Sequence, residues 1–207
     1  MSQIDTLFVT KVYRAMLTGR GQRRLNTEIK AAAEAIAVDD EAGRRWSREK
    51  GYKGYTSYAS LNDLPWRAPE FAELVSHLDN HVAAFAKELD MDLGGTPLAL
   101  DSLWINVLEP GGTHAAHIHP HSVISGTYYV DVPQGAGAIR FEDPRLAMMM
   151  AAPPRRPRAR AENRSFVEIA PRPGMVLLWE SFLRHEVPRN DGAEPRISVS
   201  FNYNQGG

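Results

Sequence analysis

From Leu98 onward the sequence is dominated by short segments of β-branched and aromatic residues, which are separated by proline and glycine. Segments of this composition with turn residues between them are predicted to be strands. Short strands at regular spacing are typical of an antiparallel barrel or jelly roll, the architecture that includes the cupins. The predicted strands are 102–108, 125–132, 138–141, 166–169, 175–179 and 196–203.

The first 97 residues contain the helical patterns. Pro69 suits the first turn of a helix, and apolar residues then recur at helical spacing to about residue 93. A weaker apolar stripe predicts a second helix, capped at Asn26 or Thr27 and running to about Val38. His77 and His81 lie four residues apart on the stronger helix, but they flank its apolar stripe and are interpreted as structural or solvated.

These patterns predict an α+β chain that is mainly β. A long amphipathic helix must cover an apolar surface, and the predicted sheet is the obvious one. We therefore expect a single domain over 1–207, in which 1–97 supply an edge strand at 6–16 and supporting helices. Residues 98–207 would form the β core with any metal site.

Two segments have less regular patterns. Residues 43–66 mix charges with glycines and five aromatic side chains, which fits either a partner or substrate surface or, more commonly, connecting loops packed on their own domain. Residues 146–165 contain three consecutive methionines, three prolines and, from Arg155 to Arg164, five arginines against one glutamate. A mobile lid, a contact for an acidic partner and a solvated loop all fit this segment.

Composition excludes several classes of function. The 24 basic and 25 acidic side chains nearly cancel, so no overall charge favours nucleic acid or anionic membranes. The chain has no cysteine, which excludes disulfides, thiol nucleophiles and iron–sulfur clusters, so any metal must bind His, Asp or Glu. Without a signal peptide pattern or a bilayer-spanning apolar run, the expected location is the cytoplasm. A homodimer is compatible with the sequence but nothing requires one.

Four of the seven histidines lie between residues 114 and 121, immediately before a predicted strand. Side chains alternate in an extended segment, so His117 and His119 point the same way and can share one metal ion. The third ligand is predicted to be His185, the remaining histidine in the C-terminal half. Imidazole ligands do not select among iron, nickel, copper, zinc and manganese. His114 and His121 are interpreted as outer or surface residues, although either could replace a named ligand.

A second chemical pattern is Arg196-Ile-Ser198 on the last predicted strand. Alternation places the guanidinium and the hydroxyl on one face, where together they suit a carboxylate. An isolated arginine would more simply form a surface ion pair, but the histidines favour a binding role.

These motifs resemble the non-haem iron(II), 2-oxoglutarate-dependent oxygenases of the prolyl-hydroxylase-like superfamily, in particular a group of small bacterial oxygenases. The resemblance lies in His117-Ile-His119-Pro, the strand from Ser125 to Val130, Phe141-Glu-Asp-Pro-Arg145 and Arg196 to Asn202, and it covers most of 102–204. It implies a double-stranded β-helix that binds Fe(II) and uses 2-oxoglutarate as cosubstrate. It also implies site roles for the two triad histidines His117 and His185, for Arg196 with Ser198 and Tyr129 on the distal carboxylate of 2-oxoglutarate, and for Asn106 as a cosubstrate contact.

One departure from the family pattern is His119, which occupies the position of the usual carboxylate ligand. The resemblance implies a dioxygenase that hydroxylates an unidentified small molecule or peptide, with release of succinate and CO2. The three-histidine set keeps two alternatives open. One is a cupin-type metalloenzyme that does not use 2-oxoglutarate, and the other is a non-catalytic β-barrel that binds a metal or a small acid.

Overall fold

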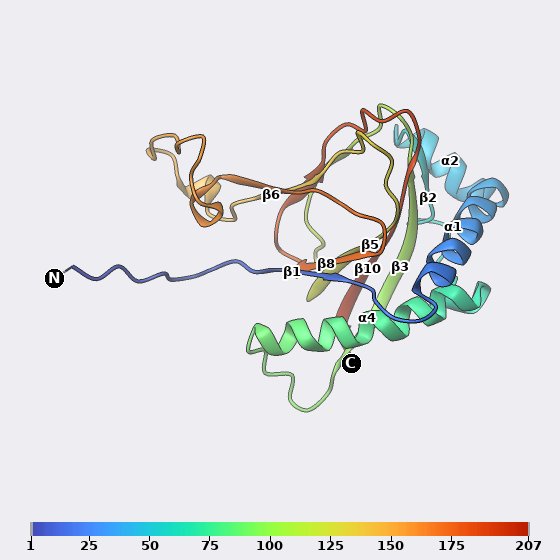
Figure 1. The fold of residues 1–207 in the computed structure, drawn as a ribbon, viewed down its shortest axis with the longest axis horizontal. Helices are drawn as coiled ribbons and strands as arrows, with labels where there is room; N and C mark the ends of the chain where they lie inside the picture. The colour runs from blue at the N-terminus through green and yellow to red at the C-terminus, as the bar shows by residue number, and fades with distance from the viewer. Residues whose placement is uncertain (1, 207) are drawn as a thin grey trace.

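The computed structural model of the protein describes residues 2–206, which form two facing β-sheets with helices outside one of them (Figure 1). Every paired strand is antiparallel. The larger sheet has the order β1 (Val12–Met16), β8 (Met175–Glu180), β5 (Ile124–Asp131), β10 (Arg196–Gln205), β3 (Leu98–Leu108) and β2 (Gly54–Thr56). The smaller sheet has the order β4 (His114–His117), β9 (His185–Val187), β6 (Ile139–Glu142) and β7 (Phe166–Ile169). The predicted jelly roll is confirmed.

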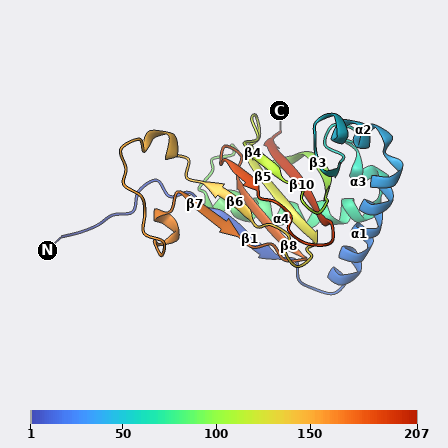
Figure 2. The ribbon, with the colours of Figure 1, turned by 90° about the horizontal axis from the view of Figure 1, so that it is seen from above.

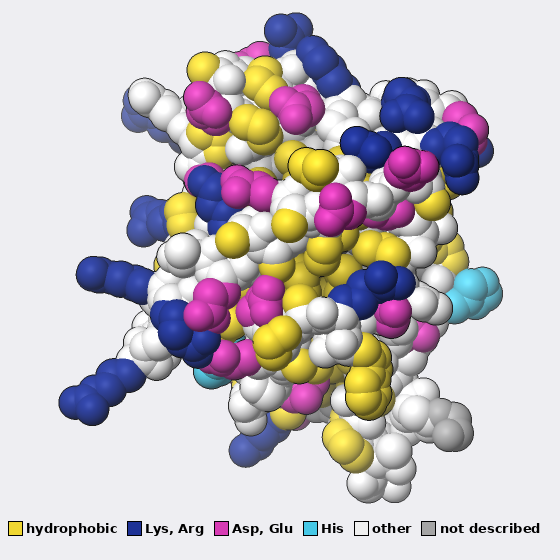
Figure 3. Space-filling model, turned by 90° about the vertical axis from the view of Figure 1, so that its right-hand side faces the viewer, with side chains coloured by type: hydrophobic (Ala, Val, Ile, Leu, Met, Phe, Trp, Pro, Cys, Tyr) yellow, Lys and Arg dark blue, Asp and Glu magenta, His cyan; other side chains and the backbone are white. Residues whose placement is uncertain are grey.

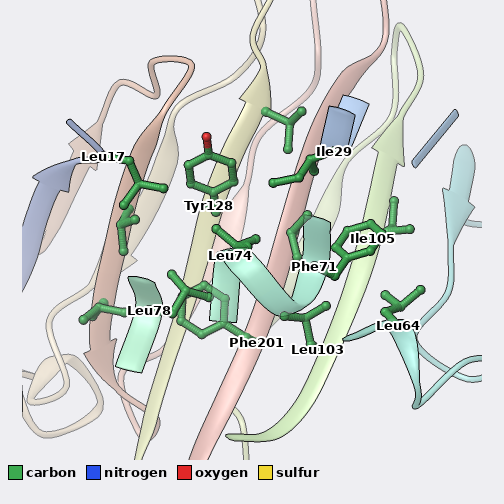
Figure 4. Packing of buried hydrophobic residues seen from close by; sticks show 14 of the residues in the cluster. Leu17, Ile29, Leu64, Phe71, Leu74, Leu78, Leu103, Ile105, Tyr128 and Phe201 are labelled. Atoms are coloured by element: carbon green, nitrogen blue, oxygen red, sulfur yellow. The ribbon is translucent and has the colours of Figure 1, made fainter. Parts of the chain in front are cut away.

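Four α-helices precede most of the strands: α1 (Gln22–Asp39), α2 (Glu41–Glu49), α3 (Leu64–Arg67) and α4 (Pro69–Glu88). Side chains from α1 and α4 pack on the outer face of the larger sheet, as Figure 4 shows for Phe71, Leu74 and Leu78 of α4. All three are fully buried, and they share one core with Leu103 and Phe201 of the sheet. The prediction that the amphipathic helix after Pro69 covers a sheet is therefore confirmed.

Alternation along the strands gives the larger sheet two different faces. On β10, Ile197, Val199 and Phe201 belong to the core beneath the helices. Arg196, Ser198 and Ser200, which alternate with them, line the cavity between the two sheets. Along this strand, polar side chains thus lie between the two sheets, and apolar side chains lie between the larger sheet and the helices. A second apolar cluster, which includes Phe141, Leu177 and Trp179, also lies between the sheets.

Some boundaries predicted from the sequence were wrong. The first helix begins at Gln22 rather than at a cap on Asn26 or Thr27, and Gly21 precedes it with a positive φ of 92°. Asn26 instead lies inside α1, where its side chain donates to the Val130 carbonyl and accepts from the Tyr128 hydroxyl. It joins the helix to the sheet. The expected edge strand does lie at the sheet edge, but it begins at Val12.

The segment 43–66 is more regular than a set of connecting loops. It contains most of α2, the short strand β2 and the start of α3. Asp40 caps α2 by accepting a hydrogen bond from the Gly43 amide, and it also accepts one from the Tyr55 hydroxyl at 2.9 Å. These contacts tie the helix to β2 at the edge of the larger sheet.

Residues 143–165 leave the smaller sheet between β6 and β7 as a long excursion that extends away from the body (Figures 1 and 2). It contains the short 3₁₀ helices η1 (Leu146–Met148) and η2 (Ala161–Asn163). Its two ends meet, because the Asp143 amide donates to the Ser165 carbonyl at 2.8 Å. Between them the five arginines of 155–164 are exposed, which is compatible with each of the three interpretations of this segment.

The side of the molecule seen in Figure 3 carries basic and acidic side chains interspersed, without a large region of one sign. This agrees with the balanced composition. Within residues 2–206, no helix has both the length and the apolar character needed to cross a bilayer.

Candidate metal centre

His117, His119 and His185 converge between the two sheets. His117 ends β4 and His185 begins β9, and the antiparallel pairing of these strands sets the two residues opposite each other. His119 follows two residues after His117, and its amide donates to the Ser181 carbonyl near β9. One potential ligand atom from each histidine lies within 4.8 Å of the other two. The three residues expected to form a site are therefore neighbours in the structure.

Hydrogen bonds orient two of these imidazoles. Nδ1 of His117 lies 2.7 Å from the Ala115 carbonyl, and Nδ1 of His185 lies 2.9 Å from the Leu183 carbonyl. A carbonyl can only accept, so each Nδ1 carries the proton and each Nε2 keeps its lone pair. Nε2 of His119 is buried and has no hydrogen-bond partner in the protein. Backbone carbonyls commonly fix metal-binding histidines in this way, so the three residues fit a metal ion.

Burial keeps the imidazoles of His119 and His185 uncharged. It lowers the pKa of His185 to about 3 and that of His119 to about 4, and the neighbouring His117 lowers both further. At neutral pH both side chains therefore offer a lone pair to a cation without first losing a proton.

Arg196 and Ser198 line the same cavity as the three histidines. The cavity has a volume of about 40 Å³. Only 4% of Arg196 is exposed. Its guanidinium donates to the Gly137 carbonyl at 3.1 Å, whereas Nε has no partner and no carboxylate forms an ion pair with it among the described residues. A buried guanidinium in this state is costly unless an anion joins it.

The two other predicted cosubstrate residues also line this cavity. The guanidinium carbon of Arg196 lies 5.8 Å from the ring centre of Tyr129, and burial raises the pKa of that tyrosine to about 12. Its hydroxyl therefore stays protonated and able to donate. The Asn106 amide already accepts from Thr56 and donates to Ser200, each at 3.0 Å. Asn106 is thus held rigidly at the wall.

The remaining histidines differ in position. His114 lines the cavity, and its ring centre lies 4.9 Å from that of Tyr52. His121 is exposed and has a positive φ of 71°. His81 shares a hydrogen bond with the Tyr13 hydroxyl at 2.9 Å, so the structural interpretation of this residue agrees with the contact. His77 is exposed on α4.

Several cavity residues were not identified from the sequence. Trp104 stacks on His119 with ring centres 5.8 Å apart. The ring centres of Trp179 and His185 are 4.6 Å apart, and the indole nitrogen of Trp179 is buried without a hydrogen-bond partner. Trp104 could have been identified because it lies two residues before Asn106 on one strand, so both side chains are on the same face. Thr127 has the same relation to Tyr129.

Fold and site together define a double-stranded β-helix with a three-histidine centre suited to a metal ion and a buried arginine suited to an anion. Residues 102–202 match a family model described as "Putative 2OG-Fe(II) oxygenase". The stretch that carries the site thus matches the 2-oxoglutarate- and Fe(II)-dependent oxygenases, which confirms the resemblance. The protein is accordingly an oxidoreductase whose cofactor is Fe(II) and whose cosubstrate is 2-oxoglutarate. No curated protein matches the sequence.

Solved structures share the fold over nearly the whole chain. The α-ketoglutarate-dependent epimerase SnoN from nogalamycin biosynthesis has a TM-score of 0.62 at 18% identity, over 94% of this chain and 76% of SnoN. A prolyl-4-hydroxylase from Pseudomonas putida has a TM-score of 0.58 at 13% identity, over 96% and 94%. HygX from Streptomyces hygroscopicus, with nickel, 2-oxoglutarate and hygromycin B bound, has a TM-score of 0.60 at 18% identity, over 94% and 82%. Identities this low support the fold alone.

Proposed function

We propose that the protein hydroxylates a small molecule or a peptide side chain at the three-histidine centre. In this reaction one oxygen atom of dioxygen enters a C–H bond of the substrate, and the other enters succinate as 2-oxoglutarate loses CO2. The observation that carries the proposal is the buried Arg196, whose Nε has no partner and whose side chain lines the same cavity as the histidines.

In this proposal His117, His119 and His185 hold the iron through Nε2. Iron(II), when bound there, supplies the site for the 2-oxo acid and for dioxygen. Arg196 and Ser198 bind the distal carboxylate of 2-oxoglutarate, because a guanidinium and a hydroxyl on one strand face offer several donors to two oxygens. The Tyr129 hydroxyl donates to the same group.

Asn106 has a positioning role in this proposal. Its amide is bonded to Thr56 and Ser200, so it fixes the cavity wall next to Ser198 and leaves at most one N–H for the cosubstrate. Thr56 belongs to β2, so the N-terminal segment supplies a hydrogen bond to a residue that lines the cavity. We accordingly propose that 1–97 support the 98–207 core within one domain and do not form a separate one.

An anaerobic titration tests the proposal. Protein loaded with Fe(II) is titrated with 2-oxoglutarate while the visible charge-transfer band of a chelated 2-oxo acid is recorded. We expect a saturable band in the wild type, none in His185→Ala, and a much weaker affinity in Arg196→Leu. His121→Asn is the matched control, because this histidine is exposed near the ligands and asparagine tolerates a positive φ.

The opposite results would favour the alternatives. His119 in place of a carboxylate is the observation that supports a three-histidine metalloenzyme without 2-oxoglutarate. Absence of the band in protein that contains stoichiometric iron, or full turnover by Arg196→Leu, would support that alternative. Metal binding without any dioxygen consumption would indicate a binding protein.

A further inference from the structure

We infer that His119 makes the metal ion and 2-oxoglutarate bind as a more strongly coupled pair than a carboxylate ligand would, because the cavity offers the metal no anionic ligand and also contains Arg196. This inference rests on the proposed function. It concerns His119, the residue at which the chain departs from the usual ligand set.

The charges of the cavity support the inference. No aspartate or glutamate is among the residues that line it, and Arg196 is the only side chain there with a fixed charge. The acidic residues nearest to His185 and Phe141 in sequence are paired elsewhere. Glu186 forms an ion pair with Arg140, and Glu142 forms one with Arg184 at 3.3 Å.

A divalent ion held by three neutral imidazoles would therefore share the cavity with a second, uncompensated cation. The guanidinium is buried, and charges inside a protein interact more strongly than in bulk solvent. The buried guanidinium opposes the metal, and no protein carboxylate offsets it. The formal charge of the metal-loaded cavity is +3, against +2 for the same site with a carboxylate ligand.

2-Oxoglutarate relieves this repulsion at both ends. One of its carboxylates would lie at the metal and the other at Arg196, so its two negative charges reduce the formal charge of the cavity to +1. The cosubstrate thus provides the anionic ligand that His119 does not. By linkage, whatever factor 2-oxoglutarate adds to the metal affinity, the metal adds to the affinity for 2-oxoglutarate.

Binding of Mn²⁺, which is followed by the loss of the free-ion signal in electron paramagnetic resonance, tests the inference without turnover. Its dissociation constant is measured in the absence and presence of saturating 2-oxoglutarate, in wild type and in His119→Asp. We expect 2-oxoglutarate to tighten Mn²⁺ binding to the wild type by roughly 5- to 150-fold. In His119→Asp we expect tighter binding of Mn²⁺ alone and a smaller factor.

Arg196→Gln provides a second variant in case His119→Asp does not fold. It removes the opposing cation, so Mn²⁺ alone should bind more tightly than to wild type, while the effect of 2-oxoglutarate shrinks. His121→Asn should keep the wild-type values. Equal Mn²⁺ affinity with and without bound 2-oxoglutarate, or an equal factor in wild type and His119→Asp, would overturn the inference. Failure of 2-oxoglutarate to bind even at saturating Mn²⁺ would instead contradict the proposed function.

Discussion

The two faces of the larger sheet differ in what they contribute to the protein. The face toward α1 and α4 buries apolar side chains such as Ile105, Val199 and Phe201, and burial of each stabilises the fold by roughly 1.5–3 kcal/mol. Along β3 and β10 the opposite face buries polar side chains such as Asn106 and Ser198 at little gain in stability. The same strands therefore supply stability on one face and chemistry on the other, and mutations should separate the two.

The largest effect is expected on the cavity face. His185→Ala should abolish 2-oxoglutarate-dependent dioxygen consumption, because a ligand is lost, while the thermal midpoint of the metal-free protein should fall less than in a mutant of the core beneath the helices. Oxygen-electrode assays and differential scanning calorimetry would check this. A lower midpoint comparable to that of a core mutant would contradict the separation of the two faces.

The next largest effect is expected on the helix face. Phe71→Ala should lower the free energy of unfolding by about 3–5 kcal/mol, since Phe71 is fully buried and its removal leaves a cavity. Urea denaturation measures this change. Under native conditions the folded fraction should still bind Mn²⁺ with the wild-type affinity.

A substitution at Gly126 on β5 tests how tightly the face toward the helices is packed. The backbone of this glycine lines the cavity, but a Cβ atom would point to the helix face and lie 2.4 Å from the Phe201 ring. Gly126→Ala should cost about 1–3 kcal/mol through overpacking. Phe201→Leu in the same chain should recover part of that loss, which a double-mutant cycle in urea would detect as coupling.

The smallest effect is expected at Asp40, outside both faces. Burial alone would raise the pKa of Asp40, but hydrogen bonds from Ser60, the Gly43 amide and Tyr55 lower it below its usual value. The pKa is thus lower in the folded than in the unfolded chain, so the contribution of Asp40 to stability is present above pH 4 and disappears as the pH falls through the folded pKa.

Asp40→Ala should cost about 0.5–2 kcal/mol at pH 7, as expected for loss of an N-cap. Asp40→Asn should keep most of the cap and lose this part of the pH dependence. Unfolding curves between pH 3 and 7 measure both. An unchanged pH dependence in Asp40→Asn would assign the effect to other carboxylates.

The sequence predicts the β core well because each strand carries its own signal. Residues 166–169 are strand at the predicted positions, and Arg196 and Ser198 share a face because alternation requires it. The strands β4 and β9 were not predicted. Both are short, and apart from Val187 they consist of histidine, alanine and glutamate, which carry little β signal. Their pairing with each other, and that of β9 with β6, defines them.

The same distinction between local and tertiary information applies to the site. His117 and His119 could be grouped from their spacing, whereas the contact of Trp179 with His185 depends on how β8 and β9 cross. Asparagine is a residue type that favours helix caps, but Asn26 lies within the helix, where it forms tertiary hydrogen bonds with Tyr128 and Val130. Propensity predicts local structure only where no such partner competes.

The joined ends of the excursion 143–165 have a practical consequence. Because the backbones of Asp143 and Ser165 are hydrogen-bonded to each other, the segment between them leaves and re-enters the sheet at one point. Its length is therefore not dictated by the strands it connects. We therefore expect that the segment can be lengthened or shortened, and that a reporter domain can be inserted there, without a change in the register of β6 and β7.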